Sequence, residues 1–146
     1  MVESSIFHGG SIQKVEAFGS AAAEATAAFG LGDLYIEEFI PRARHIEVQV
    51  AGDRTGAVVH LYERECSLQR RHQKLIEIAP APSLDPALRD RICAAAVTLA
   101  KAAGVVTLTT VEFLVDEATG RFVFMEANPR LQVEHTVTEE VTGLDL

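Results

Sequence analysis

The chain has 146 residues, of which 48% are hydrophobic and 23% charged, so it is long enough for one domain with a sizeable core. Its formal net charge of -8 argues against general binding to nucleic acid or to a membrane surface. No apolar run approaches the roughly 20 residues of a membrane span, and the N-terminus lacks the pattern of a signal peptide. We therefore expect a cytoplasmic protein in which Cys66 and Cys93 are free thiols.

The first part of the chain predicts a helix followed by a strand. Residues 15–29 are rich in alanine, carry larger apolar residues on one stripe and are followed by Gly30, which predicts a helix with a glycine stop. Residues 34–40 predict a strand that is closed by Pro41.

The next segment predicts a β-hairpin. Apolar and polar residues alternate over 44–50, so one face of this strand is apolar and the other is polar. A turn at 52–56 leads into a return strand at 57–64. Two prolines then make 78–82 a rigid extended connector.

The second half predicts a long helix and another hairpin. Asp85 is a suitable N-cap for a helix that has Pro86 in its first turn and ends at Gly104. Strands are expected at 107–115 and 122–127. The helix residues expected to face the core are Leu88, Ile92, Ala95, Ala96, Leu99 and Ala103.

A capping box at Thr136 and Glu139 predicts a short last helix that runs toward Gly143. The predicted order is therefore helix, hairpin, helix, hairpin, helix. This order indicates an α+β domain with a mostly antiparallel sheet and helices packed on one face.

Two acids are expected to meet across the last hairpin. If Asp116 pairs with Phe122, the same register opposes Glu112 and Glu126, with Cβ atoms about 5 Å apart. Asn128 shares the face of Glu126. Like charges at this separation repel unless a cation lies between them, and a hard divalent ion such as Mg²⁺, carried by nucleotide phosphates, fits oxygen ligands. The alternative is a solvated acid pair at a sheet edge.

A run of basic and amide residues follows the first hairpin at 69–74. Alone, such a run is typical of a solvated surface loop. Lys74, however, is a compact charge suited to an oxyanion, and Arg130 offers a planar fork for a carboxylate-shaped anion. Gln132 and the backbone near Val133 could complete the anion pocket.

Glu134 follows directly, and a carboxylate beside a bound anion is unfavourable. It becomes useful if Glu134 takes a proton from that anion or from its product. The alternative is that Glu134 caps the helix that begins near Thr136.

Weaker signals point to a nucleotide. Backbone groups at the end of the strand at 34–40 could hydrogen-bond to the edge of an adenine ring, with Ile40 and Leu114 packed on that ring. His45 and Gln69 could reach the ribose hydroxyls. A histidine on a polar strand face is, however, more often a hydrogen-bonded surface residue. Together these residues indicate a site where ATP, a divalent metal and a small oxyanion meet.

Six motifs between residues 34 and 146 form a specific combination. They are YIEEFI at 35–40, RHIEVQV at 44–50, ERECSLQRRHQK at 63–74, APAP at 79–82, VEFL at 111–114 and FMEANPRLQVEHTVTE at 124–139. This combination resembles the ATP-grasp part of biotin carboxylase, as found in acetyl-CoA, propionyl-CoA, pyruvate and urea carboxylases. Carbamoyl-phosphate synthetase shares only a part of this combination, namely the acid, the asparagine and the arginine at the end of the last strand.

The resemblance implies that biotin on a carrier is carboxylated by bicarbonate and ATP through carboxyphosphate, with Mg²⁺ or Mn²⁺ as the metal. The implied partners are a biotin carboxyl carrier domain and a carboxyltransferase. The implied metal ligands are Glu112, Glu126 and Asn128. The implied bicarbonate contacts are Lys74, Arg130, Gln132 and Val133, and Glu134 is the implied base, so that Glu134, Arg130 and Lys74 form the catalytic group. The implied nucleotide contacts are Glu37, Glu38, Ile40, His45, Gln69, His72 and Leu114.

The chain also departs from this family. Only Gly9 and Gly10 stand where the glycine-rich lid is expected, so residues 1–33 resemble a degenerate lid region with an alanine-rich helix, and 34–146 the ATP-grasp subdomain. We therefore expect a fragment that is inactive alone. The alternatives are a non-catalytic remnant that forms homo-oligomers through free sheet edges, or a ligase of the carbamoyl-phosphate-synthetase type.

Overall fold

The computed structural model describes residues 11–34, 40, 42–71 and 73–146, and it divides the chain into two compact units, 1–39 and 40–146. In the first unit, α1 (Ser11–Phe29) confirms the alanine-rich helix and begins earlier than predicted. Gly30 follows it with a φ of 77°, as expected for a glycine stop. The strand predicted at 34–40 falls mostly on 35–39, outside the described residues.

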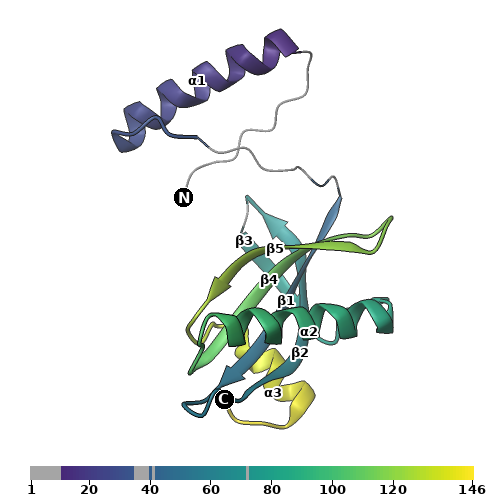
Figure 1. Cartoon of the computed structure of the whole chain (residues 1–146). Coiled ribbons are helices and arrows are strands. Elements are labelled where there is room, and N and C mark those ends of the chain that lie inside the picture. The colour runs from purple at the N-terminus through teal and green to yellow at the C-terminus, as the bar shows by residue number, and fades with distance from the viewer. Residues whose placement is uncertain (1–10, 35–39, 41, 72) are drawn as a thin grey trace. The chain divides into compact units, whose positions relative to one another are not determined.

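The second unit is built on one five-stranded sheet in the order β3-β2-β1-β4-β5, with all neighbours antiparallel (Figure 1). The strands are β1 (Ala43–Gly52), β2 (Val58–Arg70), β3 (Gln73–Ile78), β4 (Leu108–Asp116) and β5 (Arg121–Asn128). The α+β class and the antiparallel sheet are confirmed.

The hairpin formed by β2 and β3 corrects the expectation of a surface loop at 69–74. β2 does not stop at residue 64 but continues to Arg70, and Arg71 turns the chain back with a φ of 52°. Gln69 then pairs with Lys74, and Arg70 pairs with Gln73. The pattern missed this hairpin because its pairing uses the backbone of charged and amide residues, which show no apolar alternation.

The long helix α2 (Pro86–Ala102) begins as predicted, because the side chain of Asp85 accepts a hydrogen bond from the backbone nitrogen of Leu88 at 2.9 Å. Its buried face differs from the prediction. Leu99 is 39% exposed and Ala103 is exposed, since the sheet covers a line of residues one position further along the helix. The buried residues of α2 are Leu88, Ile92, Cys93, Ala96 and Ala100.

The helix α2 lies across one face of the sheet (Figure 1). The hydrophobic core lies between them, and most of its sheet side chains come from β1 and β4. The short helix α3 (His135–Thr142) contacts β2, and its Thr138 hydroxyl accepts a hydrogen bond from Arg64 on the other face. Packing on a single face therefore holds for α2 but not for α3. The sheet residues of the core are Ile46, Val48, Val50, Val58, Val111, Phe113 and Val115.

The start of α3 also corrects a prediction. Thr136 lies inside the helix rather than at its cap, and the N-cap is Glu134, whose side chain makes no capping hydrogen bond. The predicted end is confirmed, because Gly143 closes the helix in the left-handed conformation with a φ of 71°.

The register of the last hairpin is right at the acids and wrong at the turn. Asp116 pairs with Arg121 instead of Phe122, but a β-bulge then leaves Met125 unpaired, so that Glu112 pairs with Glu126 as predicted. The turn is one residue shorter than predicted, and the bulge adds one unpaired residue to β5. The two differences cancel, so the pairing of Glu112 with Glu126 is unchanged.

Both cysteines are free, as predicted, and both are buried. Among the helices of the described residues, none has the length and apolar character needed to cross a membrane.

Candidate active site

One face of the sheet carries polar side chains that are buried rather than solvated. β1 places Ile46 and Val48 in the core beneath α2, and the residues between and after them, Glu47 and Gln49, point to the opposite face. Both polar residues are 0% exposed. Charged and amide groups buried in this way need hydrogen-bonding partners.

Arg64 of β2 supplies several of these partners. Its guanidinium is 0% exposed, and its Nε donates to Glu47 Oε1 at 2.5 Å. Its Nη1 donates to Gln49 Oε1 at 3.0 Å and to Thr138 Oγ1 at 2.8 Å, while its Nη2 donates to Thr110 Oγ1 at 3.4 Å. One side chain thus links β1, β2, β4 and α3.

Lys74 of β3 holds three carboxylates together. Its Nζ donates to Glu47 Oε2 at 2.5 Å and to Glu112 Oε1 and Glu134 Oε1, both at 3.2 Å. Burial by itself would lower the pKa of Lys74, but the charge of Glu47 and the hydrogen bond to it outweigh burial and raise that pKa above its ordinary value. Lys74 is therefore an ammonium ion at neutral pH.

His45 is a second partner of Glu112, and it is buried rather than at the surface, with 7% exposure. The amide nitrogen of Gln69 donates to His45 Nδ1 at 2.8 Å, so the neutral ring carries its proton on Nε2, which lies 2.5 Å from Glu112 Oε2. Burial would raise the pKa of Glu112, but the hydrogen bond from His45 and the charge of Lys74 lower it. Glu112 is thus held as a carboxylate.

The two acids of the last hairpin converge as predicted. Asn128 Nδ2 lies 3.0 Å from Glu112 Oε1 and 3.0 Å from Glu126 Oε1. Glu112 is 1% exposed, whereas Glu126 is exposed, so the pair is open to solvent on one side. Two carboxylates and an amide side chain form a donor set that fits Mg²⁺ or Mn²⁺.

Apart from Lys74, which lies on β3, the predicted anion-binding residues lie between β5 and α3. Glu134 is in contact with Lys74, whereas Arg130 is exposed and its Nη1 donates to the backbone oxygen of the next residue at 3.4 Å. Val133 is 89% exposed, and Gln132 is buried with an Oε1 that meets no donor among the described residues. The structure therefore unites Lys74 and Glu134 and leaves Arg130 outside their contacts.

The predicted nucleotide residues are only partly described. Leu114 of β4 pairs with His45 of β1, which in turn bonds to Gln69, so these three are neighbours. Ile40 is buried at 9% exposure. The other predicted nucleotide contacts lie outside the described residues: Glu37, Glu38 and His72.

The sequence argument missed Glu47 and Arg64 as members of the network. A signal was present, because the alternation of 44–50 places Glu47 on the polar face. Its importance follows only from the pairing of β1 with β4, which sets Glu47 directly beside Glu112.

Comparisons with known proteins identify the family of the chain. The family profile described as Carbamoyl-phosphate synthase L chain, ATP binding domain, matches residues 9–146. Pyruvate carboxylase 1 of Caenorhabditis elegans is 59% identical over 131 residues, which are 90% of this chain but 11% of that protein. The chain therefore spans about a tenth of the length of such relatives.

Solved structures give the same picture. A biotin carboxylase complex with βγ-ATP from Campylobacter jejuni is 53% identical with a TM-score of 0.79, and the match covers 89% of this chain and 29% of that one. The biotin carboxylase domain dimer of Hydrogenobacter thermophilus 2-oxoglutarate carboxylase, in complex with MgADP, ADP and bicarbonate, is 48% identical with a TM-score of 0.78, covering 92% and 29% of the two chains.

The profile matches nearly the whole chain. Together with these relatives, it shows that the protein belongs to the family of the carbamoyl-phosphate synthase L chain ATP-binding domain and, within that family, to the biotin carboxylases.

Proposed function

We propose that the chain is the ATP-binding part of a biotin carboxylase, which uses ATP and bicarbonate to carboxylate biotin held on a carrier domain. The observation that carries the proposal is the position of Lys74, whose Nζ touches both Glu112 and Glu134. One cation thereby joins the acid pair suited to a metal to the residue suited to act as a base.

In this proposal Glu112 and Glu126 bind Mg²⁺ or Mn²⁺, with Asn128 beside them. A divalent ion held by these residues would supply positive charge that neutralises phosphate oxygens during phosphoryl transfer. The lowered pKa of Glu112 supports the assignment, because a metal ligand must be deprotonated.

Bicarbonate is held by Lys74, Arg130, Gln132 and the backbone at Val133, and Glu134 accepts its proton. Lys74 contributes because its raised pKa keeps a positive charge where the anion forms. The deprotonated anion then attacks the terminal phosphate of ATP, which gives carboxyphosphate and releases ADP. Carboxyphosphate supplies the carboxyl group for biotin, and inorganic phosphate is released. Arg130 is exposed, so it can turn toward an anion without breaking a buried contact.

The nucleotide contacts proposed are Glu37, Glu38, Ile40, His45, Gln69, His72 and Leu114. Residues 1–33 form the lid region and 34–146 the ATP-grasp subdomain. We further propose a cytoplasmic location, with a biotin carboxyl carrier domain and a carboxyltransferase as partners and without nucleic-acid or membrane contacts.

The test measures bicarbonate-dependent ATP hydrolysis by the full-length protein that carries this sequence. Lys74→Met should lower kcat/KM at least about 100-fold, as loss of a preorganised charge at a reacting oxyanion does. The control is Lys101→Met, because Lys101 is exposed at the end of α2. Equal activity of the Lys74 variant and the control would overturn the proposal.

A second function, self-association without catalysis, is favoured by one observation. The edge strand β3 exposes Leu75 at 63% and Ile76 at 52%. Titration calorimetry with Mg-ATP and sedimentation of the 146-residue chain distinguish the two functions. Oligomers that form without any affinity for Mg-ATP support the second function.

A further inference from the structure

Glu77 of β3 is a partly buried acid to which the proposed reaction gives no role. Both of its carboxylate oxygens are buried, and no hydrogen-bond donor in the described part of the chain reaches either of them. Burial, with a contribution from the charge of Glu47, raises the pKa of Glu77 to about 8. An acid left without a partner in this way requires a proton or a cation nearby.

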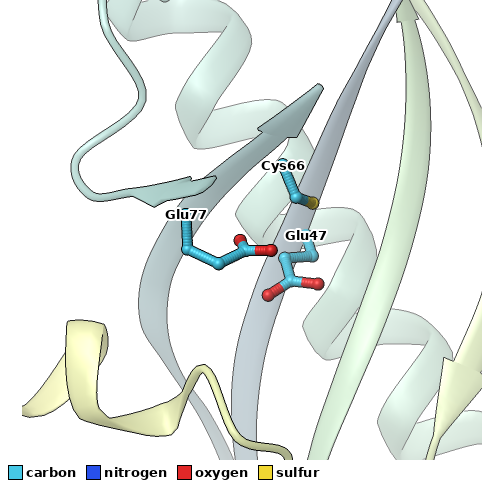
Figure 2. Close-up of side chains that lie close together, drawn as sticks. All are labelled: Glu47, Cys66 and Glu77. Atoms are coloured by element: carbon cyan, nitrogen blue, oxygen red, sulfur yellow. The ribbon is translucent and has the colours of Figure 1, made fainter. Parts of the chain in front are cut away.

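Two other potential ligands face the same point. Figure 2 shows the carboxylate of Glu77 directed toward the side chains of Cys66 and Glu47. One ligand atom from each of the three residues lies within 4.8 Å of the others. Cys66 and Glu47 are both 0% exposed, so their side chains are fixed by the packing around them.

The cations nearby are already engaged by other acids. Arg64 bonds to Glu47, and Lys74 bonds to Glu47, Glu112 and Glu134. These two positive charges face four carboxylates when Glu77 is counted, so negative charge is left over if Glu77 ionises.

We propose that Glu47, Cys66 and Glu77 form a second metal site, which binds zinc or a similar thiophilic divalent cation. One sulfur and two carboxylate oxygens, with water in the fourth position, are a tetrahedral zinc set. Magnesium prefers oxygen ligands alone, so this site differs in selectivity from the pair formed by Glu112 and Glu126.

Metal binding replaces the thiol proton of Cys66 by a metal–sulfur bond, and the proton passes to the buffer. Where Glu77 is protonated it also releases its proton on binding. The high pKa of the buried thiol makes binding weaker at low pH, because the metal must compete with the proton. The Glu47 carboxylate keeps lone pairs for the metal while it accepts from Lys74.

The test titrates the metal-free 146-residue chain with Co²⁺, a spectroscopic substitute for zinc. A thiolate ligand produces a sulfur-to-cobalt charge-transfer band, and we expect this band to saturate at one equivalent. Cys66→Ser should abolish the band, while Cys93→Ser should retain it, because Cys93 is a buried free thiol of α2 that belongs to the hydrophobic core and not to this cluster. A missing band in the unsubstituted chain, or one that survives Cys66→Ser, would overturn the proposal.

Glu77→Gln tests the carboxylate without changing the size of the side chain. Its zinc affinity, measured by calorimetry, should fall at least about tenfold, since even residues that only support a metal ligand change affinity by 10–100-fold. Circular dichroism of each variant checks that it is folded. Unchanged zinc affinity in the folded Glu77→Gln chain would refute the site. None of these measurements depends on carboxylase activity, so they can fail while the proposed function stands.

Discussion

Substitution of Arg64 by methionine should strongly destabilise the second unit. Arg64 is 0% exposed and is the donor to Oε1 of the equally buried Glu47. Removing one partner of a buried ion pair costs about 3–5 kcal/mol. Lys74 still bonds to Glu47 after the substitution, so we expect the lower end of this range. The unpaired Gln49 oxygen adds about 1 kcal/mol. This loss is a large fraction of the roughly 5–15 kcal/mol that stabilises a typical domain.

The assay is urea denaturation of the 146-residue chain at pH 7, followed by circular dichroism. Glu117→Gln is the control, because Glu117 is 70% exposed and lies 3.6 Å from its partner Arg44, so its loss should cost less than about 1 kcal/mol. The double variant Arg64→Met with Glu47→Gln should be more stable than Arg64→Met alone, since it removes the buried carboxylate charge that has lost Arg64. A double variant that is less stable than the single one would refute this explanation.

Three further changes test other parts of the molecule. Asp85→Ala should destabilise the chain by about 1 kcal/mol in urea denaturation, because the N-terminal hydrogen bond to Leu88 is lost; no change would mean that the cap is dispensable. Gly52→Ala should lower stability by about 1–3 kcal/mol, because an added Cβ would lie 2.1 Å from the backbone oxygen of Val105, and a melting temperature equal to that of the unsubstituted chain would contradict the close approach. Glu77 should make stability depend on pH, because its pKa rises from 4.5 to about 8 on folding: the folded chain keeps a proton that the unfolded chain releases, so this contribution to stability falls as pH increases between those values. In denaturation at a series of pH values, Glu77→Gln should therefore gain stability relative to the unsubstituted chain between pH 4.5 and 8, and a constant difference would argue against the shifted pKa.

Local patterns predicted the elements whose signals are local. The alternation around Val48 identified β1, and the pairing of Asp85 with a following proline identified the start of α2. β3 was missed because it is a short edge strand in a polar run, and only its pairing with β2 makes it a strand. The buried face of α2 was misplaced at Leu99, since the small side chains of Ala96 and Ala100, not the larger leucine, lie against the sheet.

The candidate site shows the same division. The meeting of Glu112 and Glu126 follows from one hairpin, so it was predictable from spacing. The joining of Lys74 to Glu134 depends on a strand and a loop that are distant in the sequence, and spacing alone does not bring them together. Likewise, the burial of Arg64 depends on α3 covering that face of the sheet.

The bulge in the last hairpin separates the acid pair from the turn beyond it. On the inner side of the bulge, Glu112 is held opposite Glu126 by the adjoining pairs of the ladder. The turn at 117–120 lies on the outer side, where Asp116 organises it by accepting from the nitrogen of Ala118 at 3.0 Å. The turn at 117–120 is therefore a suitable place to attach a fluorophore or a peptide tag. A fluorophore there could report ligand binding near Glu112 and Glu126 without shifting either side chain.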